Sequence, residues 1–297
     1  MAEGVKTDGV AMSTACGAFD RLTRTSSIVS SNFLMRLVIL GQALIEHDLR
    51  AVPYPGYGPI RDRLRGADVV FSDLETSLVT DAPATPTREG VFFHSARTDV
   101  VDCLRDLSVN LLALSNNHSF DLGQAGVDAA IDACRSRGIA HAGTGITLDA
   151  ASAPGYLGTP SGRVGLVAFA SKVPDVSLAD AHRGGVNHLC LRADGTLVTA
   201  DRERVLKSIA EAAVHADLVI AYHHDHYWEA DWHRTPVWKQ EFAQACIDAG
   251  AHLYVSHGVP LLHGIELYRG RPIFYGLGSF VFHTHTKIGH YEPAVWE

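Results

Sequence analysis

The stretch Val109–Gly123, VNLLALSNNHSFDLG, joins a short apolar run to a sharply polar segment. Its apolar half has the length and composition of a strand that is buried on both faces. Two asparagines and His118 follow at once, Asp121 comes three residues later, and a helical pattern begins just beyond. Ligands of layered α/β proteins bind where strands end in loops. This junction therefore predicts a functional loop.

The same alternation of strand and helix continues on both sides of this stretch. Further apolar runs suited to buried strands are Arg36–Gly41, Asp68–Ser72, Arg163–Ala170, Asp217–His223, His252–Ser256 and Pro272–Gly276. Apolar positions recur at helical spacing over Thr98–Leu107, Gln124–Arg137, Arg202–His215 and Pro236–Ala249. Strands that alternate with helices predict an α/β layered fold whose sheet core is shielded on both faces.

The chain is organised as one domain with a short arm before it. Residues 1–34 are rich in small and polar residues and show no clear periodicity, so we expect an N-terminal arm. Residues 35–297 contain no internal repeat and no linker, so we expect a single domain there. A chain of 297 residues is long enough to bury a substantial core.

Composition and charge exclude some classes of partner. A net charge of -8 argues against a nucleic-acid-binding face, which needs clustered lysine and arginine. No apolar run approaches the roughly 20 residues that cross a bilayer, so we expect no membrane span. Five scattered cysteines without a CxxC pair indicate reduced thiols, and hence a cytoplasmic protein. A peptide or small-molecule substrate fits these limits, and the oligomeric state stays open.

Residues that bind metals gather where the predicted strands end. The chain has 17 histidines, more than half of them after Val219. The polar residues at five strand ends are Gln42 with Glu46, His47 and Asp48; Asp73 and Glu75; Asn116, Asn117 and His118; His223, His224, Asp225 and His226; and His257. This mixture of carboxylate, amide and imidazole suits a divalent Mn, Fe or Zn ion. Such an ion lowers the pKa of bound water and so supports hydrolysis.

His118 is the candidate proton donor to the leaving group, and Asp121 is placed to orient its imidazole. In the alternative interpretation, Asn116, Asn117 and Asp121 only cap the helix that begins near Leu122. Alternation along an extended chain sends His224 and His226 to the same side, whereas His223 faces the opposite way. We therefore expect His223 to be structural.

The order of several motifs resembles the CapA, or poly-γ-glutamate biosynthesis, family, which is related to the calcineurin-like metallophosphoesterases. The motifs are Leu74-Glu75; Asn116-Asn117-His118 with Asp121 and Gly123; Trp228-Glu229 with Pro236 and Gln240; and GIELYRGRPIFYGLGSFVF from Gly264 to Phe282. The resemblance covers roughly Leu37 to Phe282. It implies a four-layer α/β/β/α sandwich, metallophosphoesterase-like, with metals in a cleft at the strand ends.

The resemblance also implies a set of site residues. The catalytic residues are expected to be His118 and Asp121, and the metal ligands Asp73, Glu75, Asn117, His224, His226 and His257. The chain departs from the family pattern at Gln42, where an aspartate is expected, and at Pro260, where a second histidine is expected. We therefore expect a reduced site with one or two ions, or a metal-free relative. Relatives continue beyond the last strand, so a shortened C-terminus is also expected.

Three functions remain open from the sequence. The first is a metal-dependent, hydrolase-like enzyme of the CapA family that acts on an amide (γ-glutamyl-type) or phosphoester bond, in poly-γ-glutamate or related peptide and metabolite processing. The second is a calcineurin-like phosphoesterase. The third is a scaffold subunit that kept the fold without metal, because fold alone does not decide function.

Overall fold

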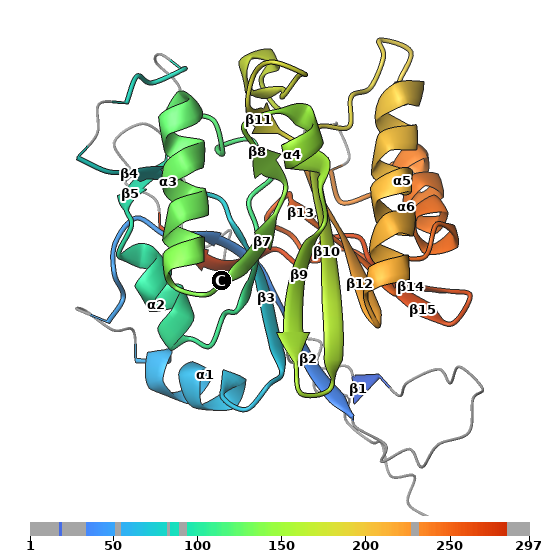
Figure 1. Ribbon diagram of the computed structural model, residues 1–297. Helices are drawn as coiled ribbons and strands as arrows, with labels where there is room; N and C mark the ends of the chain where they lie inside the picture. Colours follow the sequence, from blue (N-terminus) through green and yellow to red (C-terminus); the bar gives the residue numbers. More distant parts are fainter. Residues whose placement is uncertain are drawn as a thin grey trace, which may run out of the picture.

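The computed structural model describes residues 34–50, 55–81, 84–88, 94–226 and 232–283, together with the backbone of residues 18–19 (Figure 1). The helices within these ranges are α1 (Tyr57–Leu64), α2 (Val100–Asp106), α3 (Gly123–Ser136), α4 (Leu148–Ser152), α5 (Thr199–His215) and α6 (Val237–Asp248), with a 3-10 turn at Asp175–Ser177. The remaining elements are strands, most of which belong to two large sheets.

The first sheet has the strand order β1-β2-β3-β6-β7, and β16 also pairs with β2. Its strands are β1 (Ala18–Phe19), β2 (Met35–Leu44), β3 (Val69–Leu74), β6 (Leu111–Ala113), β7 (Ala140–Ala142) and β16 (Ser279–Phe282). Every pairing except that of β1 with β2 is parallel. The carboxyl ends of β2, β3, β6 and β16 therefore meet along one edge of the sheet.

The second sheet has the order β14-β15-β13-β12-β10-β9. Its strands are β9 (Gly155–Thr159), β10 (Gly162–Ser171), β12 (Leu218–Asp225), β13 (Leu253–Gly258), β14 (Ile265–Tyr268) and β15 (Arg271–Phe274). The four central strands are parallel, and β9 and β14 are antiparallel edges. Two short pairs, β4 (Ser77–Val79) with β5 (Ser95–Arg97) and β8 (Thr144–Gly145) with β11 (Gly185–Val186), lie beside the large sheets.

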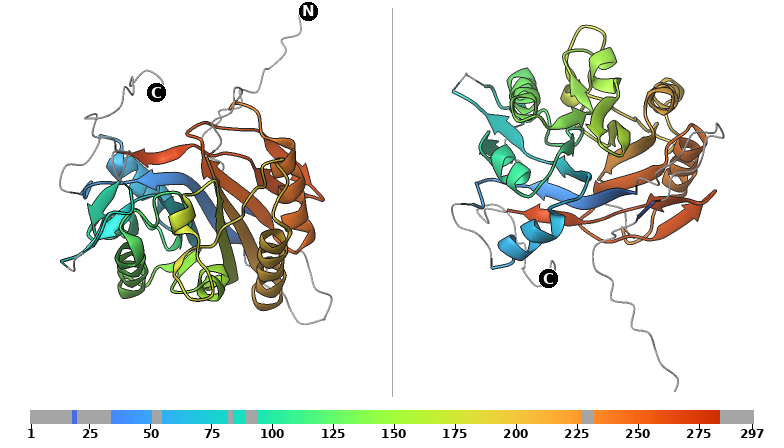
Figure 2. Two further views of the ribbon diagram at one scale, coloured as in Figure 1. Left: turned by 90° about the horizontal axis from the view of Figure 1, so that it is seen from above. Right: turned by 60° about the horizontal axis from the view of Figure 1, so that its bottom comes forward.

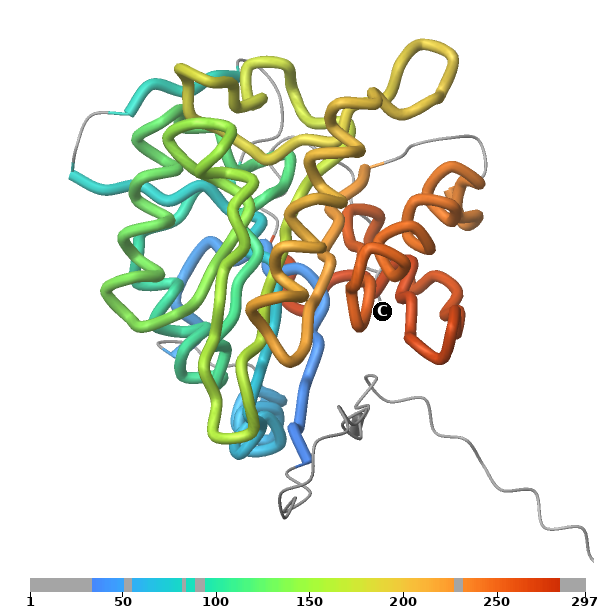
Figure 3. Tube along the Cα trace, turned by 45° about the vertical axis from the view of Figure 1, so that its right-hand side comes forward, coloured from blue at the N-terminus to red at the C-terminus, as the bar shows by residue number. Residues whose placement is uncertain are grey.

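Three apolar layers hold four layers of secondary structure together. One cluster lies between the first sheet and helices α1, α2 and α3, and includes Leu104 and Ile131. A second joins the two sheets face to face, with Phe71 against Tyr222. A third lies between the second sheet and helices α5 and α6, which Figure 3 shows next to one another on that face. The predicted four-layer α/β/β/α sandwich is therefore confirmed.

Strand β16 brings the end of the described chain back to its beginning. It lies parallel to β2, so the red and blue strands are neighbours in Figure 2. A Cβ on Gly41 would lie 2.6 Å from the Gly278 carbonyl oxygen and 2.8 Å from the Phe280 nitrogen. Glycine at position 41 thus permits the close approach of the two strands.

The strongly patterned elements lie where the sequence predicts them. The seven expected strands correspond to β2, β3, β6, β10, β12, β13 and β15, and the four expected helices to α2, α3, α5 and α6. Helix α1 is not predicted, because YGPIRDRL combines glycine, proline and three charged residues with a weak apolar pattern. Strands β9 and β14 are edge strands, largely half-buried or exposed, and lack the apolar run by which a buried strand is recognised.

Candidate functional site

Parallel strands of both sheets end around one cleft of about 570 Å³. The residues that line it are Gln42, Leu44, Glu75, Arg88, Asn117, His118, Lys172, Val173, Pro174, His226, Gly258, Pro260 and Phe282. They come from the ends of β2, β3, β6, β10, β12, β13 and β16, from the loops that follow these strands and, for Arg88, from the loop between β4 and β5. The strand ends singled out in the sequence thus converge on a single concave surface.

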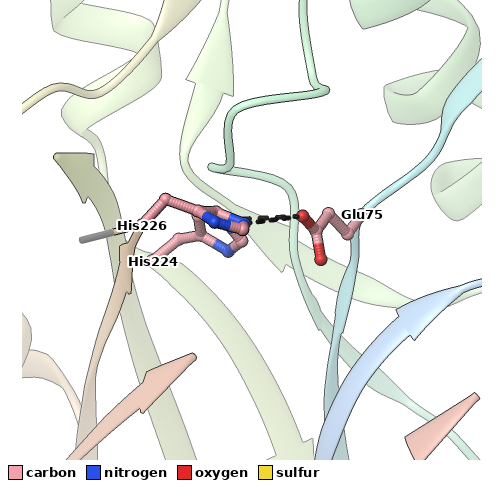
Figure 4. A group of neighbouring side chains, drawn as sticks. All are labelled: Glu75, His224 and His226. Carbon is pink, nitrogen blue, oxygen red and sulfur yellow. Dashed lines mark hydrogen bonds and ion pairs between the residues drawn. The ribbon is translucent and has the colours of Figure 1, made fainter. Parts of the chain in front are cut away.

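Glu75, His224 and His226 form the tightest group of possible metal ligands at the cleft (Figure 4). One ligand atom from each lies within 4.8 Å of the others. Glu75 Oε1 is 3.3 Å from His226 Nε2 and 3.7 Å from His224 Nε2. Glu75 directly follows β3, and the two histidines come from the end of β12, so the group bridges the two sheets.

His224 is held so that one ring nitrogen faces this group. Its Nδ1 is 3.1 Å from Asp73 Oδ2 and 3.3 Å from the Tyr222 hydroxyl, and its Nε2 is 2.8 Å from Asn117 Oδ1. With the Nδ1 proton on the Asp73 side, Nε2 carries a lone pair. Lone pairs of His224, Asn117 and Glu75 then converge, which is the arrangement that a bound cation satisfies.

The protonation states of these groups also fit a cation. Burial lowers the pKa of His224 to about 3, so its imidazole is neutral near pH 7 and can act as a ligand. Burial raises the pKa of Asp73 to about 7, although a hydrogen bond from Asn116 opposes the shift. A nearby positive charge would favour the ionised carboxylate. Asp73 lies on the far side of the His224 ring from Glu75, where it is placed to orient the ring.

His257 lies beside His224, because the two residues pair across β12 and β13. Its ring is buried against Tyr222, and burial lowers its pKa to about 3. Neither ring nitrogen of His257 makes a hydrogen bond of ordinary geometry with any described residue, and the same is true of Glu75 Oε2. Buried polar atoms are nearly always satisfied. These orphan atoms are therefore a second indication that the site fits a metal, although His257 is outside the tightest group.

His118 and Asp121 form the second functional unit of the site. Nδ1 of His118 is 2.7 Å from Asp121 Oδ2, and both side chains are buried. Helix α3 has Leu122 at its N-cap position without a side-chain cap bond. The capping interpretation of Asp121 is therefore wrong. Its carboxylate orients the imidazole of His118, whose side chain lines the cleft.

The backbone of His118 is also fixed. Its N–H donates to Asn116 Oδ1 at 3.0 Å, and its carbonyl accepts from the Ser77 hydroxyl at 2.6 Å. The Asn116 amide nitrogen donates in turn to Asp73 and to the Leu74 carbonyl. The two asparagines therefore differ in role: the side chain of Asn116 stabilises the loop, whereas the side chain of Asn117 faces His224.

Arg88 is a site residue that sequence reasoning missed. Its Nε is 2.8 Å from Asp121 Oδ1, and its Nη2 donates to the Asn117 carbonyl. Arg88 comes from a loop between β4 and β5 and carries no motif of its own. Only the tertiary contact with the NNHSFD loop reveals it.

The two departures from the family pattern have different structural outcomes. Gln42 Oε1 accepts from the Gly258 N–H at 3.0 Å, and its Nε2 lies 3.4 Å from the Ser279 hydroxyl. Its amide thus joins β2 to the last residue of β13 and to the first residue of β16. Pro260 lines the cleft and offers no side-chain ligand. The expectation of a reduced site stays a prediction.

Other histidines lie away from the chemistry. His223 faces the core as expected, with Nδ1 2.6 Å from the Tyr254 hydroxyl and Nε2 2.8 Å from the Ser171 hydroxyl. His283 is buried, and its Nδ1 accepts a hydrogen bond from the Glu46 N–H. Trp228 and Glu229 of the family motif lie outside the described residues.

His188, Cys190 and Asp201 form another group whose ligand-type atoms lie within 4.8 Å. Asp201 is already satisfied there by the Cys190 N–H and by Arg204 Nη1, at 3.0 and 2.8 Å. Burial raises the pKa of the Cys190 thiol to about 11, which keeps it protonated. This group is better explained as a hydrogen-bonded anchor for α5 than as a metal site.

Within the described part of the chain, no helix has the length and apolar character that a membrane crossing requires.

Comparison with known proteins identifies the relatives of the chain. Residues 36–284 match the model of the bacterial capsule synthesis protein family PGA_cap. Protein y4sH of Sinorhizobium fredii is 29% identical over 331 residues, which cover 92% of this chain and 71% of that protein. The PGA biosynthesis protein CapA of Bacillus subtilis is 30% identical over 220 residues, covering 73% of this chain and 54% of the relative. A probable polyglutamine synthesis accessory protein of Mycobacterium tuberculosis is 30% identical over 236 residues, covering 76% and 58%.

The family match spans both sheets and every strand end that lines the cleft. The capsule and polyglutamate proteins align over the greater part of the chain. The chain therefore belongs to the bacterial capsule synthesis protein family PGA_cap, the CapA family that the motifs of the sequence resemble.

Proposed function

We propose that the chain is a metal-dependent hydrolase-like enzyme of the capsule synthesis family that acts on a γ-glutamyl-type amide or a phosphoester bond. The observation that carries the proposal is the convergence of Glu75, Asn117 and His224 acceptor atoms beside a buried His118–Asp121 pair. Relatives named for capsule and polyglutamate synthesis make a peptide-like or metabolite substrate the natural choice.

Glu75, His224 and His226 would hold the ion, together with the amide oxygen of Asn117. When bound, such an ion polarises a substrate oxygen and makes water a nucleophile near neutral pH. His257 and Asp73 border this group, the first as a possible further ligand and the second as the residue that orients His224.

The chain's own residues then perform the proton transfer. The Nδ1–H of His118 donates a hydrogen bond to Asp121 Oδ2. The charged imidazole then carries its second proton on Nε2, toward the cleft. His118 in its charged form gives the Nε2 proton to the departing oxygen or nitrogen of the substrate. Asp121 stabilises the imidazolium until the proton leaves, as a carboxylate partner does in hydrolytic triads.

The proposal is tested by metal analysis of protein purified without chelator, followed by turnover assays. We expect bound Mn, Fe or Zn, a rise in Tm when metal is added, and hydrolysis of a γ-glutamyl peptide or a generic phosphoester. Asn117→Ala should abolish this turnover, whereas His215→Ala, a change at an exposed histidine of α5, should leave it intact. Absence of metal and of any Tm response would refute the proposal and favour a metal-free scaffold.

The substrate class is decided by the same assays. Turnover of phosphoesters alone supports a calcineurin-like phosphoesterase. Cleavage of γ-glutamyl peptides with inert phosphoesters supports the amide activity.

A further inference from the structure

Arg88 occupies an unusual position for an arginine of a surface loop. Its side chain is only 16% exposed, yet it lines the cleft beside Glu75, Asn117 and His118. A guanidinium that is largely buried needs partners for its charge and its five N–H donors. Its partners among the described residues account for only part of this demand.

The contacts that Arg88 makes with described residues leave one end of the guanidinium for a ligand. Nε faces Asp121 Oδ1 at 2.8 Å, and Nη2 donates to the Asn117 carbonyl. Neither contact uses Nη1. Since the side chain borders the cleft, Nη1 is the donor that a molecule bound there can reach.

The loop that carries Arg88 is docked before any ligand arrives. The Thr87 N–H donates to the Asp121 carbonyl at 2.8 Å, and the Thr87 hydroxyl donates to the Phe120 carbonyl at 2.7 Å. Arg88 is thereby held in register with the His118 loop. A donor that is preorganised in this way loses little conformational entropy when it binds a ligand.

The charges around the cleft favour an anion at this position. Asp121 pairs with Arg88, and Glu75 is the only carboxylate among the described residues that line the cleft. A divalent ion held by Glu75, His224 and His226 would make this end of the cleft positive. Arginine forks recognise planar oxyanions through paired, charge-assisted hydrogen bonds.

We propose that Arg88 is a substrate-binding residue that recognises an oxyanion, either a phosphoryl group or a carboxylate, next to the reacting bond. The statement that the oxyanion lies next to the reacting bond rests on the proposed function. The statement that Arg88 binds an oxyanion does not, because anion binding does not require turnover. Four other lining residues, Leu44, Val173, Pro174 and Phe282, are apolar and suit the uncharged part of such a substrate.

The test is calorimetric titration of the full chain with inorganic phosphate and with γ-glutamyl-glutamate, each with and without Mn²⁺. We expect Arg88→Met to weaken the anion bound by the wild type at least about tenfold, as expected for loss of a charge-assisted hydrogen bond. Arg88→Lys keeps the charge and the pairing with Asp121 but loses the fork, so an intermediate affinity is expected. Arg88→Lys also keeps the test interpretable if Arg88→Met fails to fold.

Two controls separate binding from loop positioning. Thr87→Val removes the hydroxyl contact with Phe120 without changing charge, and Arg202→Met removes an exposed arginine on α5. Arg202→Met should retain the affinity of the wild type, and Thr87→Val should lose less affinity than Arg88→Met, because the Thr87 N–H contact with Asp121 still docks the loop. Binding by Arg88→Met at the wild-type level, equal losses in Thr87→Val and Arg88→Met, or no binding of either anion by the wild type would each overturn the inference.

The outcomes also identify the oxyanion and remain distinct from the proposed function. Binding of phosphate alone assigns a phosphoryl group, and binding of the dipeptide alone assigns a carboxylate. A chain that holds no metal and turns nothing over, but loses phosphate binding in Arg88→Met, would refute the hydrolase and retain the anion site.

Discussion

His118 is the residue on which the candidate chemistry depends, and it is constrained at both backbone and ring. Asp121 holds the ring, Asn116 and Ser77 hold the backbone, and Arg88 holds Asp121 in turn. None of these four contacts involves Glu75, His224 or His226. The proton donor and the proposed metal ligands are therefore separable by mutation.

His118→Ala should lower kcat by about 10²- to 10⁴-fold, the usual contribution of a general acid, because the leaving group loses its proton source. Metal content should stay close to that of the wild type. Steady-state kinetics together with metal analysis measures both quantities. Equal loss of metal and activity would assign His118 to the metal site instead.

His257→Ala should have the opposite signature. Its buried ring lies beside His224, and neither ring nitrogen makes a hydrogen bond of ordinary geometry with a described residue, so we expect His257 to act at the ion. We expect the metal dissociation constant to rise by about tenfold or more, the effect typical of residues that support a metal site. Competition with a chelator measures it, with His215→Ala as the control. An unchanged dissociation constant would make His257 a packing residue.

At the scale of elements, the site depends on how closely β2, β13 and β16 approach one another. Gln42 bridges to Gly258, the last residue of β13, and to Ser279, the first residue of β16. Gly258 has φ +124°, and a Cβ there would lie 2.3 Å from the Asp225 carbonyl oxygen. The end of β13 can lie this close to the end of β12 only because position 258 carries no side chain.

Gly41→Ala should destabilise the fold by about 1–3 kcal/mol, because the added methyl overlaps the backbone of residues 278–280. Gly58→Ala is the matched control, since a Cβ on Gly58 in α1 meets no atom within 4 Å. Urea denaturation compares the two variants. If both have the same effect, the contact between β2 and β16 is not limiting.

A buried ion pair joins β12 to α6. Asp225 Oδ2 is 3.5 Å from Lys239 Nζ, and both side chains are at most 1% exposed. Lys239→Met should cost about 3–5 kcal/mol of stability, because it leaves a buried carboxylate without its cation. Asp225→Asn combined with Lys239→Met should cost less than Lys239→Met alone. Denaturation of the single and double variants tests this, and simple additivity would contradict it.

At the scale of the whole molecule, buried neutral histidines make stability depend on pH. Burial lowers the pKa of His94, His224 and His257 to about 3, and that of His223 well below its usual value. The unfolded chain takes up these protons near pH 6.5, but the folded chain does not. Stability is therefore present above pH 6.5 and is lost as pH falls toward 3.

We expect a loss of up to roughly 1.4 kcal/mol per pH unit for each such histidine between pH 6 and 4. The raised pKa of Asp73, about 7, makes the fold more stable as pH falls, but this one group opposes four histidines. Urea denaturation at several pH values measures the slope. His223→Gln should reduce the slope, whereas His215→Gln should not. A flat profile would show that these histidines titrate alike in both states.

Much of the fold follows from local pattern. Buried parallel strands require continuous apolar runs, and helices that cover a sheet require an apolar stripe. Each of β10, β12, α3 and α5 can therefore be predicted from its own segment of sequence. Edge strands such as β14 need no such run and are missed. Of the site, the side on which His223, His224 and His226 lie follows from strand alternation alone.

The sequence by itself determined the layered class, the order of the buried strands and covering helices, and the family, and it nominated the candidate site residues at the strand ends, because these depend on pattern and residue type within short windows. The tertiary structure alone decided that Asp73 backs His224, that Asp121 binds His118 instead of capping α3, and that Arg88 belongs to the cleft. Such contacts join residues from separate loops and strands, and their geometry exists only after the two sheets have packed.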